Sequence, residues 1–331
     1  MKLGLDLFSL RRQPWNIFQH LDYAQSIGLD VVMIPDPDFL ESLDADYLAR
    51  VKDHADLLRL ELEFGMYSIC PSSNAFSDKR GSAVEQLTQM LRVAKQLGSP
   101  YLRALLGNNG DRRSALPLRT HIDNTIATLR AARPLAMELG IKIALENHAG
   151  DLQARELKAL IQEAGTDFVG ACIDSGNPLW VAESPYVTLD HLAPHILMSH
   201  IRDAIVFEHP QGAVVQWVAL GDGTLNMPDW ARRFQEQCPR ANFTLEIISS
   251  IAPRVIDYLE PSFWDVYQET PAWEFARFLQ LVKQGKPTFV PTLTADWDEP
   301  DPTYRAALIT QQRRQVEKSV KYCREVLGIK P

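Results

Sequence analysis

Four apolar segments from residue 141 onward each lead into a carboxylate or an imidazole. The segment Ile141–Gly150 begins as a β-prone run and turns polar at Glu146, Asn147 and His148. Side chains two apart on a strand share a face, so Glu146 and His148 project the same way. Packing alone does not explain such an ending. The other three segments are Phe168–Asp174, Ile196–Asp203, which contains His200, and Phe243–Glu246.

Short apolar runs alternate regularly with amphipathic segments along the chain, which is typical of a closed parallel barrel. We predict eight strands separated by helices, a (β/α)8 TIM barrel that forms one domain over residues 1–331. A last helix is expected over 304–327. Residues 249–303 are expected to form an aromatic-rich excursion that packs over the barrel or against a partner subunit. The expected strands are 2–8, 30–34, 61–68, 101–106, 141–145, 168–173, 196–200 and 243–248.

The carboxyl ends of barrel strands meet at one mouth, so Glu146, Asp174, His200 and Glu246 are expected to face one another. Three carboxylates in a half-buried mouth would repel and become partly protonated unless a cation joined them. Oxygen-rich ligation with one imidazole suits Mn²⁺, Mg²⁺, Co²⁺ or Zn²⁺. We therefore predict one divalent ion. The alternative is that these acids only cap strand ends.

The composition of the chain disfavours several classes of binding partner. The net charge of −8 argues against a non-specific binder of nucleic acid or of anionic membranes. The four cysteines are scattered, without a C-x-x-C pair, and no apolar run of membrane-spanning length is present. We expect a cytoplasmic protein that acts on a small molecule. The sequence leaves open whether the protein forms a homo-oligomer.

The motifs at the last four strand ends resemble those of the xylose-isomerase-like barrel superfamily. This group includes sugar isomerases, ketose epimerases, dehydratases, lyases of oxidised sugars and the endonuclease IV branch. The resemblance implies that Glu146, Asp174, His200 and Glu246 are metal ligands. It makes Asp203 a supporting or substrate-side residue. The motifs that carry it are ALENH, CIDSGNPLW, SHIRDA, LGDGTLN and TLEI.

The chain departs from two branches of that superfamily. The endonuclease branch uses additional histidines from early strands to hold three metals, and strands two to four here end without a histidine. Asn177 stands where that branch and the ketose epimerases carry a histidine. One metal is therefore expected, and phosphodiester hydrolysis is not.

A single ion that binds two oxygens of a hydroxy-ketone stabilises an enediolate. An isomerase or epimerase of a sugar or ketose is the first expectation, with Glu146 and Glu246 moving the proton. A lyase that decarboxylates or dehydrates a 3-oxo sugar acid is the alternative, with His148 as acid or base. A non-catalytic carbohydrate-binding barrel is the third. The expected substrate-binding residues are Arg103, Asn177, Arg202 and Asp203.

Overall fold

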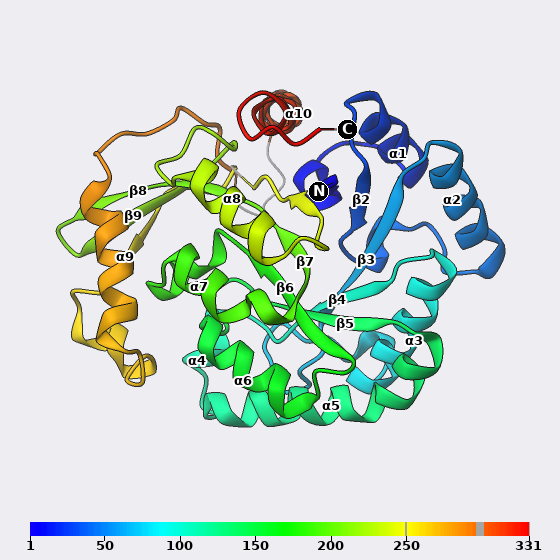
Figure 1. Cartoon of the computed structure of the whole chain (residues 1–331), viewed down its shortest axis with the longest axis horizontal. Helices are drawn as coiled ribbons and strands as arrows, with labels where there is room; N and C mark the ends of the chain where they lie inside the picture. Colours follow the sequence, from blue (N-terminus) through cyan, green and yellow to red (C-terminus); the bar gives the residue numbers. More distant parts are fainter. Residues whose placement is uncertain (249, 296–300, 331) are drawn as a thin grey trace.

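The computed structural model describes residues 1–248, 250–295 and 301–330, and its core is a parallel barrel (Figure 1). The eight barrel strands follow one another around the ring in the order β10-β1-β2-β3-β4-β5-β6-β7. Their bounds are β1 (Leu3–Asp6), β2 (Val31–Ile34), β3 (Glu61–Ser68), β4 (Tyr101–Leu105), β5 (Lys142–Glu146), β6 (Val169–Asp174), β7 (Ile196–His200) and β10 (Phe243–Leu245). The predicted fold class is confirmed.

The ring closes between β7 and β10 through a single bridge, from Ile201 to Leu245. The Ile201 amide donates to the Thr244 carbonyl at 2.8 Å, and the Glu246 amide donates to the Ile201 carbonyl at 3.1 Å. This seam therefore fixes the backbone directly beside His200 and at Glu246.

Two strands end at least two residues earlier than predicted. β1 ends at Asp6 rather than at residue 8, because the Asp6 carboxylate accepts the Phe8 amide at 2.7 Å and starts a 3₁₀ turn, η1 (Leu7–Leu10). β10 ends at Leu245 rather than at residue 248. After both strands, the chain therefore enters the mouth of the barrel earlier than the apolar pattern indicates.

Helices cover the outside of the barrel in the order expected of alternating strands and helices (Figure 1). Polar caps fix several of their starts; Ser82 and Glu85, for example, form a reciprocal capping box at α3. The helices are α1 (Ile17–Ser26), α2 (Ala45–Leu57), α3 (Ala83–Gln96), α4 (Asn109–Arg112), α5 (Leu118–Leu139), α6 (Ala154–Ala164), α7 (Pro185–Leu192), α8 (Met227–Gln237) and α10 (Pro302–Glu325). Five further 3₁₀ turns are η2 (Pro37–Phe39), η3 (Asp78–Arg80), η4 (Asn177–Val181), η5 (Ala193–His195) and η6 (Pro261–Val266).

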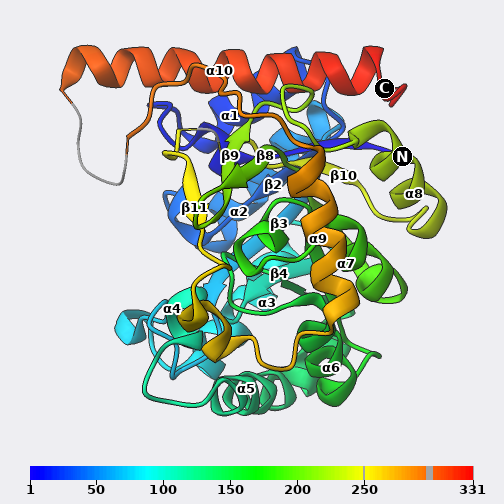
Figure 2. The same cartoon turned by 90° about the vertical axis from the view of Figure 1, so that its left-hand side faces the viewer.

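The hairpin β8 (Asp203–His209) and β9 (Gly212–Val218) leaves the barrel directly after β7. The later excursion returns to it: β11 (Arg254–Ile256) pairs antiparallel with β9. Helix α9 (Ala272–Gln284) packs against β8 and runs across the hairpin (Figure 1 and Figure 2). Ser249 and residues 296–300 of the predicted excursion lie outside the described residues.

A second apolar core holds the excursion against the barrel. It joins Phe278 and Val282 of α9 to Trp217 of β9 and to Leu179 and Val181 of η4, which follows β6. The predicted single domain therefore has a physical basis, but whether it unfolds as one unit stays a prediction.

We expect Val282→Ala to lower the free energy of unfolding of the whole chain by about 2 kcal/mol. Val282 is fully buried in the second core, so the change removes two buried methyl groups. Urea unfolding followed by far-UV circular dichroism would measure this. Val255→Ala is the control, because that side chain is 42% exposed and its loss should change stability by less than about 0.5 kcal/mol. A separate early transition confined to α9 would contradict a single cooperative domain.

Among the described residues, none of the helices has the length and apolar character needed to cross a membrane. The longest, α10, crosses one side of the barrel (Figure 2) and packs against α1, where the Tyr23 hydroxyl donates to Glu317.

Helix α1 buries one histidine between aromatic rings. The His20 ring lies 5.4 Å from Trp15 and 6.0 Å from Phe39, and burial lowers the pKa of His20 to about 4. The pKa of His20 is lower in the folded protein than in the unfolded chain, where it is about 6.5. The neutral His20 ring therefore contributes stability above a pH of about 6.5, and this contribution is lost as the pH falls towards 4. We expect His20→Phe to reduce the acid-induced loss of stability between pH 6.5 and 4 by about 3 kcal/mol. Urea titrations of both proteins across this range would measure it. Identical pH profiles would contradict the prediction.

Candidate metal centre

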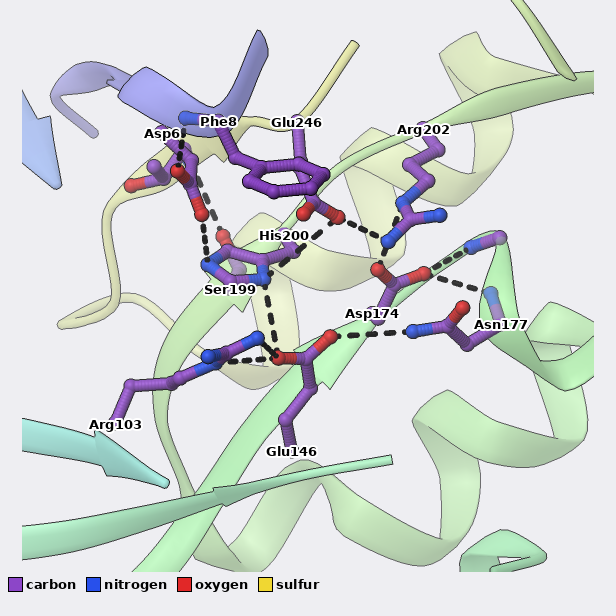
Figure 3. A network of polar contacts seen from close by, with 12 residues as sticks. Asp6, Phe8, Arg103, Glu146, Asp174, Asn177, Ser199, His200, Arg202 and Glu246 are labelled. Atoms are coloured by element: carbon purple, nitrogen blue, oxygen red, sulfur yellow. Dashed lines mark hydrogen bonds and ion pairs between the residues drawn. The ribbon is translucent and has the colours of Figure 1, made fainter. Parts of the chain in front are cut away.

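Four acid and imidazole side chains meet at the carboxyl-terminal mouth of the barrel (Figure 3). Each of the four offers one ligand atom, and these atoms all lie within 4.8 Å of one another. All four side chains are buried. We call this set the four-residue cluster: Glu146 at the end of β5, Asp174 at the end of β6, His200 at the end of β7 and Glu246 directly after β10.

Local hydrogen bonds fix the Asp174 carboxylate. The Asn147 side chain bonds both the amide and the carbonyl of Asp174, at 2.8 and 2.9 Å, which ties the end of β5 to β6. Asp174 Oδ1 accepts the amides of Gly176 and Asn177 at 2.6 and 2.7 Å. The second carboxylate oxygen, Oδ2, faces the centre of the cluster (Figure 3). This turn therefore leaves one oxygen of Asp174 for a ligand.

His200 lies between carboxylates from three strand ends. Its Nδ1 atom is 3.4 Å from Glu146 Oε2 and 3.9 Å from Glu246 Oε2, and its Nε2 atom is 3.1 Å from Asp6 Oδ2. Asp6 was not predicted as a site residue. The sequence pattern hides it, because Leu7 and Phe8 continue the apolar run past Asp6, whereas the strand ends at Asp6.

Two buried arginines reach the cluster. Arg103, on β4, is 2.5 Å from Glu146 Oε2. Arg202 bridges Asp174, at 2.9 Å, and Glu246. Both were predicted to bind substrate. In this structure both contact acids of the four-residue cluster.

The charges set the protonation of the cluster. Burial opposes ionisation of Glu146, but Arg103 and His200 outweigh burial and lower its pKa well below the ordinary value. Arg202 and His200 likewise outweigh burial at Glu246 and lower its pKa. Burial and the two neighbouring glutamates raise the pKa of Asp174 to about 8, against the opposing effect of Arg202. With the protein groups alone, Asp174 therefore keeps its proton near neutral pH.

The donor set fits a divalent cation. Several buried polar atoms of the cluster make no aligned hydrogen bond with the described residues, among them Asp174 Oδ2, Glu246 Oε2 and both nitrogens of His200. Unsatisfied buried polar atoms are costly, so their convergence indicates a shared partner. Two ligands on an ion with bonds of about 2.0–2.2 Å lie at most about 4.4 Å apart. Atoms that lie within 4.8 Å of one another are therefore close to the spacing that one ion requires, and these four residues would hold it.

The three remaining predicted site residues, Asn177, His148 and Asp203, each make a different set of contacts. Asn177 donates to Glu146 Oε1 at 3.1 Å and belongs to the cluster surroundings. His148 directs Nδ1 at the Gly107 carbonyl, 2.7 Å away, so this nitrogen carries the proton in the neutral ring. Burial lowers the pKa of His148. Asp203 accepts the amides of Ala204, Gly221 and Gly223 and holds that turn.

One curated relative is similar in sequence. It is the 3-oxo-isoapionate decarboxylase of Pectobacterium atrosepticum, 24% identical over 177 residues. The aligned residues cover 54% of this chain and 57% of the relative, so the chain spans a little more than half of that protein.

Solved structures share the fold at low identity. A D-psicose 3-epimerase, crystallised in the presence of D-fructose, has a TM-score of 0.65 and 13% identity, with 99% of this chain and 100% of that chain covered. The IOLI protein with a bound zinc atom has a TM-score of 0.57 and 16% identity, with 85% and 96% covered. Residues 21–262 also match the model of one family, and the chain therefore belongs to the xylose isomerase-like TIM barrel family.

Proposed function

We propose that this protein is a divalent-metal-dependent lyase that releases CO₂ from a small 3-oxo sugar acid. The observation that carries the proposal is the pair of arginines at the cluster: Arg103 donates to Glu146, and Arg202 forms an ion pair with Glu246. The sequence relationship to a decarboxylase of an oxo sugar acid supports it.

The arginines favour decarboxylation over proton shuttling. A glutamate held by a guanidinium stays ionised, which suits a metal ligand and does not suit a proton donor. Two-base epimerisation needs one of the two glutamates to return a proton from the opposite side of the substrate. Decarboxylation requires no such group. The bond from the α-carbon to the carboxylate breaks, CO₂ leaves, the adjacent carbonyl accepts the electron pair as an enolate, and a solvent proton adds at that carbon.

Each part of the site has a role in this reaction. A bound divalent ion supplies a Lewis acid at the carbonyl oxygen. Glu146, Asp174, His200 and Glu246 would hold it. Arg103 would hold Glu146, to which it is already bonded. Arg202, whose Nε and Nη2 pair with Asp174 and Glu246, would direct Nη1 at a substrate carboxylate, which suits an acidic substrate better than a neutral ketose. His148, neutral and hydrogen-bonded through Nδ1, keeps Nε2 as an acceptor for a substrate hydroxyl.

The second candidate is an isomerase or epimerase of a ketose. The observation that favours it is the position of Glu146 and Glu246, which come from different strand ends and both face Nδ1 of His200, at 3.4 and 3.9 Å (Figure 3). Two carboxylates so placed could address two faces of one substrate carbon.

One experiment separates the two candidates. The protein loaded with Mn²⁺ is incubated in D₂O with a panel of 3-oxo aldonic acids and, separately, with ketopentoses and ketohexoses. We expect CO₂ from an acid and a single deuterium at the carbon that lost it. An Arg103→Met variant should lose most of this activity, whereas Arg92→Met, on the exposed face of α3, should not. Deuterium in a recovered ketose isomer, without CO₂ from any acid, would overturn the proposal in favour of the epimerase.

A further inference from the structure

A cavity of about 340 Å³ lies between α4 and β11, outside the four-residue cluster. Its walls come from both ends of α4, from Trp180 of η4, from β11 and from η6, and we call it the α4–β11 cavity. In Figure 2 the chain passes from β11 to η6 beside α4. The residues that line it do not include any member of the cluster, and its volume is within the range of small-molecule pockets.

The charge of this cavity is opposite in sign to that of the whole chain. Its charged lining residues are Arg113, Arg254 and Asp257, whereas the chain carries a net charge of −8. The Arg113 guanidinium donates to the Ser262 carbonyl at 3.2 Å, and that of Arg254 lies 4.6 Å from the centre of the Trp180 ring. Within the part of the chain that the structure describes, neither arginine pairs with a carboxylate. Two guanidinium groups and one acid suit a monoanion such as a carboxylate better than a phosphate dianion.

Aromatic rings give the same cavity flat apolar surfaces. Trp180, Phe263 and Tyr267 line it. The rings of Phe263 and Tyr267 are stacked, with centroids 4.7 Å apart, and both residues are buried, so the packing fixes their positions. Stacking on the Trp180 indole leaves the N–H donors of Arg254 in the plane of its guanidinium, where a carboxylate can accept them. The walls therefore suit an acid whose carboxylate is attached to a flat apolar ring.

Two residues of the cavity wall also support the loop that carries His148. The Asn109 amide donates to the Ala149 carbonyl at 3.0 Å. Ala149 has a φ of 42°, a left-handed conformation that is unfavourable for a residue with a side chain. A Cβ added at Gly150 would lie 3.0 Å from the Asn109 Cβ and 3.3 Å from the Trp180 Cβ, so the loop packs closely against both. Contacts with the cavity wall therefore hold this loop in a strained conformation.

We propose that the α4–β11 cavity is an effector site that binds an aromatic monocarboxylate. The carboxylate pairs with Arg113 and Arg254, and the ring lies against the aromatic wall. Because the bound acid contacts Asn109 and Trp180, it shifts the loop that these residues support, and with it His148. The inference goes beyond the function proposed above, and binding of the acid does not depend on that function.

Binding without turnover tests the site. The probe is 2-naphthoate, with its neutral amide 2-naphthamide for comparison, followed by saturation-transfer NMR on the Zn²⁺-loaded protein. We expect the acid to bind at least about fivefold more tightly than the amide. Arg113→Met and Arg254→Met should each weaken naphthoate binding about tenfold, since each removes a charge-assisted hydrogen bond. Arg50→Met is the matched control, because this exposed guanidinium also lies over an aromatic ring, 5.4 Å from the centre of Tyr47, and does not line the cavity.

The two cavity variants also guard against misfolding. Both arginines are exposed, so we expect the unfolding curves of Arg113→Met and Arg254→Met to match that of the parent protein. Naphthoate binding that is unaltered in both variants would place the acid elsewhere on the protein and overturn the site. Equal binding of the acid and the amide would overturn it as well. Binding that depends on both arginines supports the site, even if no acid is decarboxylated.

The effector role has its own measurement. In protein labelled with ¹⁵N-histidine, naphthoate should shift the ring nitrogen signals of His148, which the His148→Asn variant identifies by their absence. The same addition to Arg254→Met, at a concentration that saturates the parent protein, should shift them less. Naphthoate binding that leaves the His148 signals unchanged would overturn the effector role alone.

Discussion

Asp174→Asn is expected to abolish binding of the divalent ion and to reduce activity by roughly 10³-fold or more. Asp174 Oδ1 is held by two backbone amides, so only Oδ2 is available to an ion. The amide would keep the Oδ1 contacts and place an NH₂ group where Oδ2 stands. This group cannot ligate a cation and would face the Arg202 guanidinium, donor against donor. Elemental analysis of the purified proteins and turnover at saturating Mn²⁺ would measure both losses.

Asp203→Asn is the matched control for that experiment. Asp203 is also buried and also accepts backbone amides, but it lies outside the four-residue cluster. We expect this variant to lose stability and to retain about one ion per chain. Full occupancy in Asp174→Asn, or equal loss of metal in both variants, would contradict the assignment of the ion to the cluster.

Arg202→Met is expected to lower the free energy of unfolding by about 3–5 kcal/mol in the presence of a chelator. The side chain is buried and bridges Asp174 and Glu246, so its removal leaves two buried acids without their cation. A saturating divalent ion would supply that charge, and the loss should then be clearly smaller. Urea unfolding with EDTA and with Zn²⁺ would measure both values.

Arg232→Met provides the comparison for an exposed arginine. Arg232 pairs with Asp229 and Glu236 at the surface of α8, where such pairs contribute about 0–1 kcal/mol. Its replacement should have the same small effect with and without the ion. An Arg202→Met loss that does not depend on the ion would mean that the guanidinium and the cation do not share these carboxylates.

Strand ends were the most predictable part of this molecule. Buried parallel strands are continuous apolar runs, so a polar residue at the end of a run marks the mouth of the barrel. That rule predicts that Glu146, Asp174 and His200 meet, as they do, but it does not find Asp6, because Leu7 and Phe8 continue the apolar run past this residue.

Contacts between distant segments were less predictable. Nothing in the local pattern indicates that Arg202 bridges Asp174 and Glu246, because this depends on how far a flexible side chain bends back into the mouth. The pairing of β11 with β9 was also missed, since a three-residue strand leaves no periodic signal. A cavity at the barrel mouth is lined by residues after β1 and β2, by His20 of α1 and by Tyr67 of β3, and only the folded chain places them around one space.

The order of the four-residue cluster along the chain constrains when the protein can acquire its ion. Three members come from consecutive barrel strands within 55 residues, but Glu246 follows the last strand, and its amide is part of the seam that closes the ring. During synthesis the first three side chains are available well before the fourth has been translated. A nascent chain therefore offers an incomplete set of ligands, which binds the cation more weakly. Tight binding requires the closed barrel, which forms only after Glu246 has been translated.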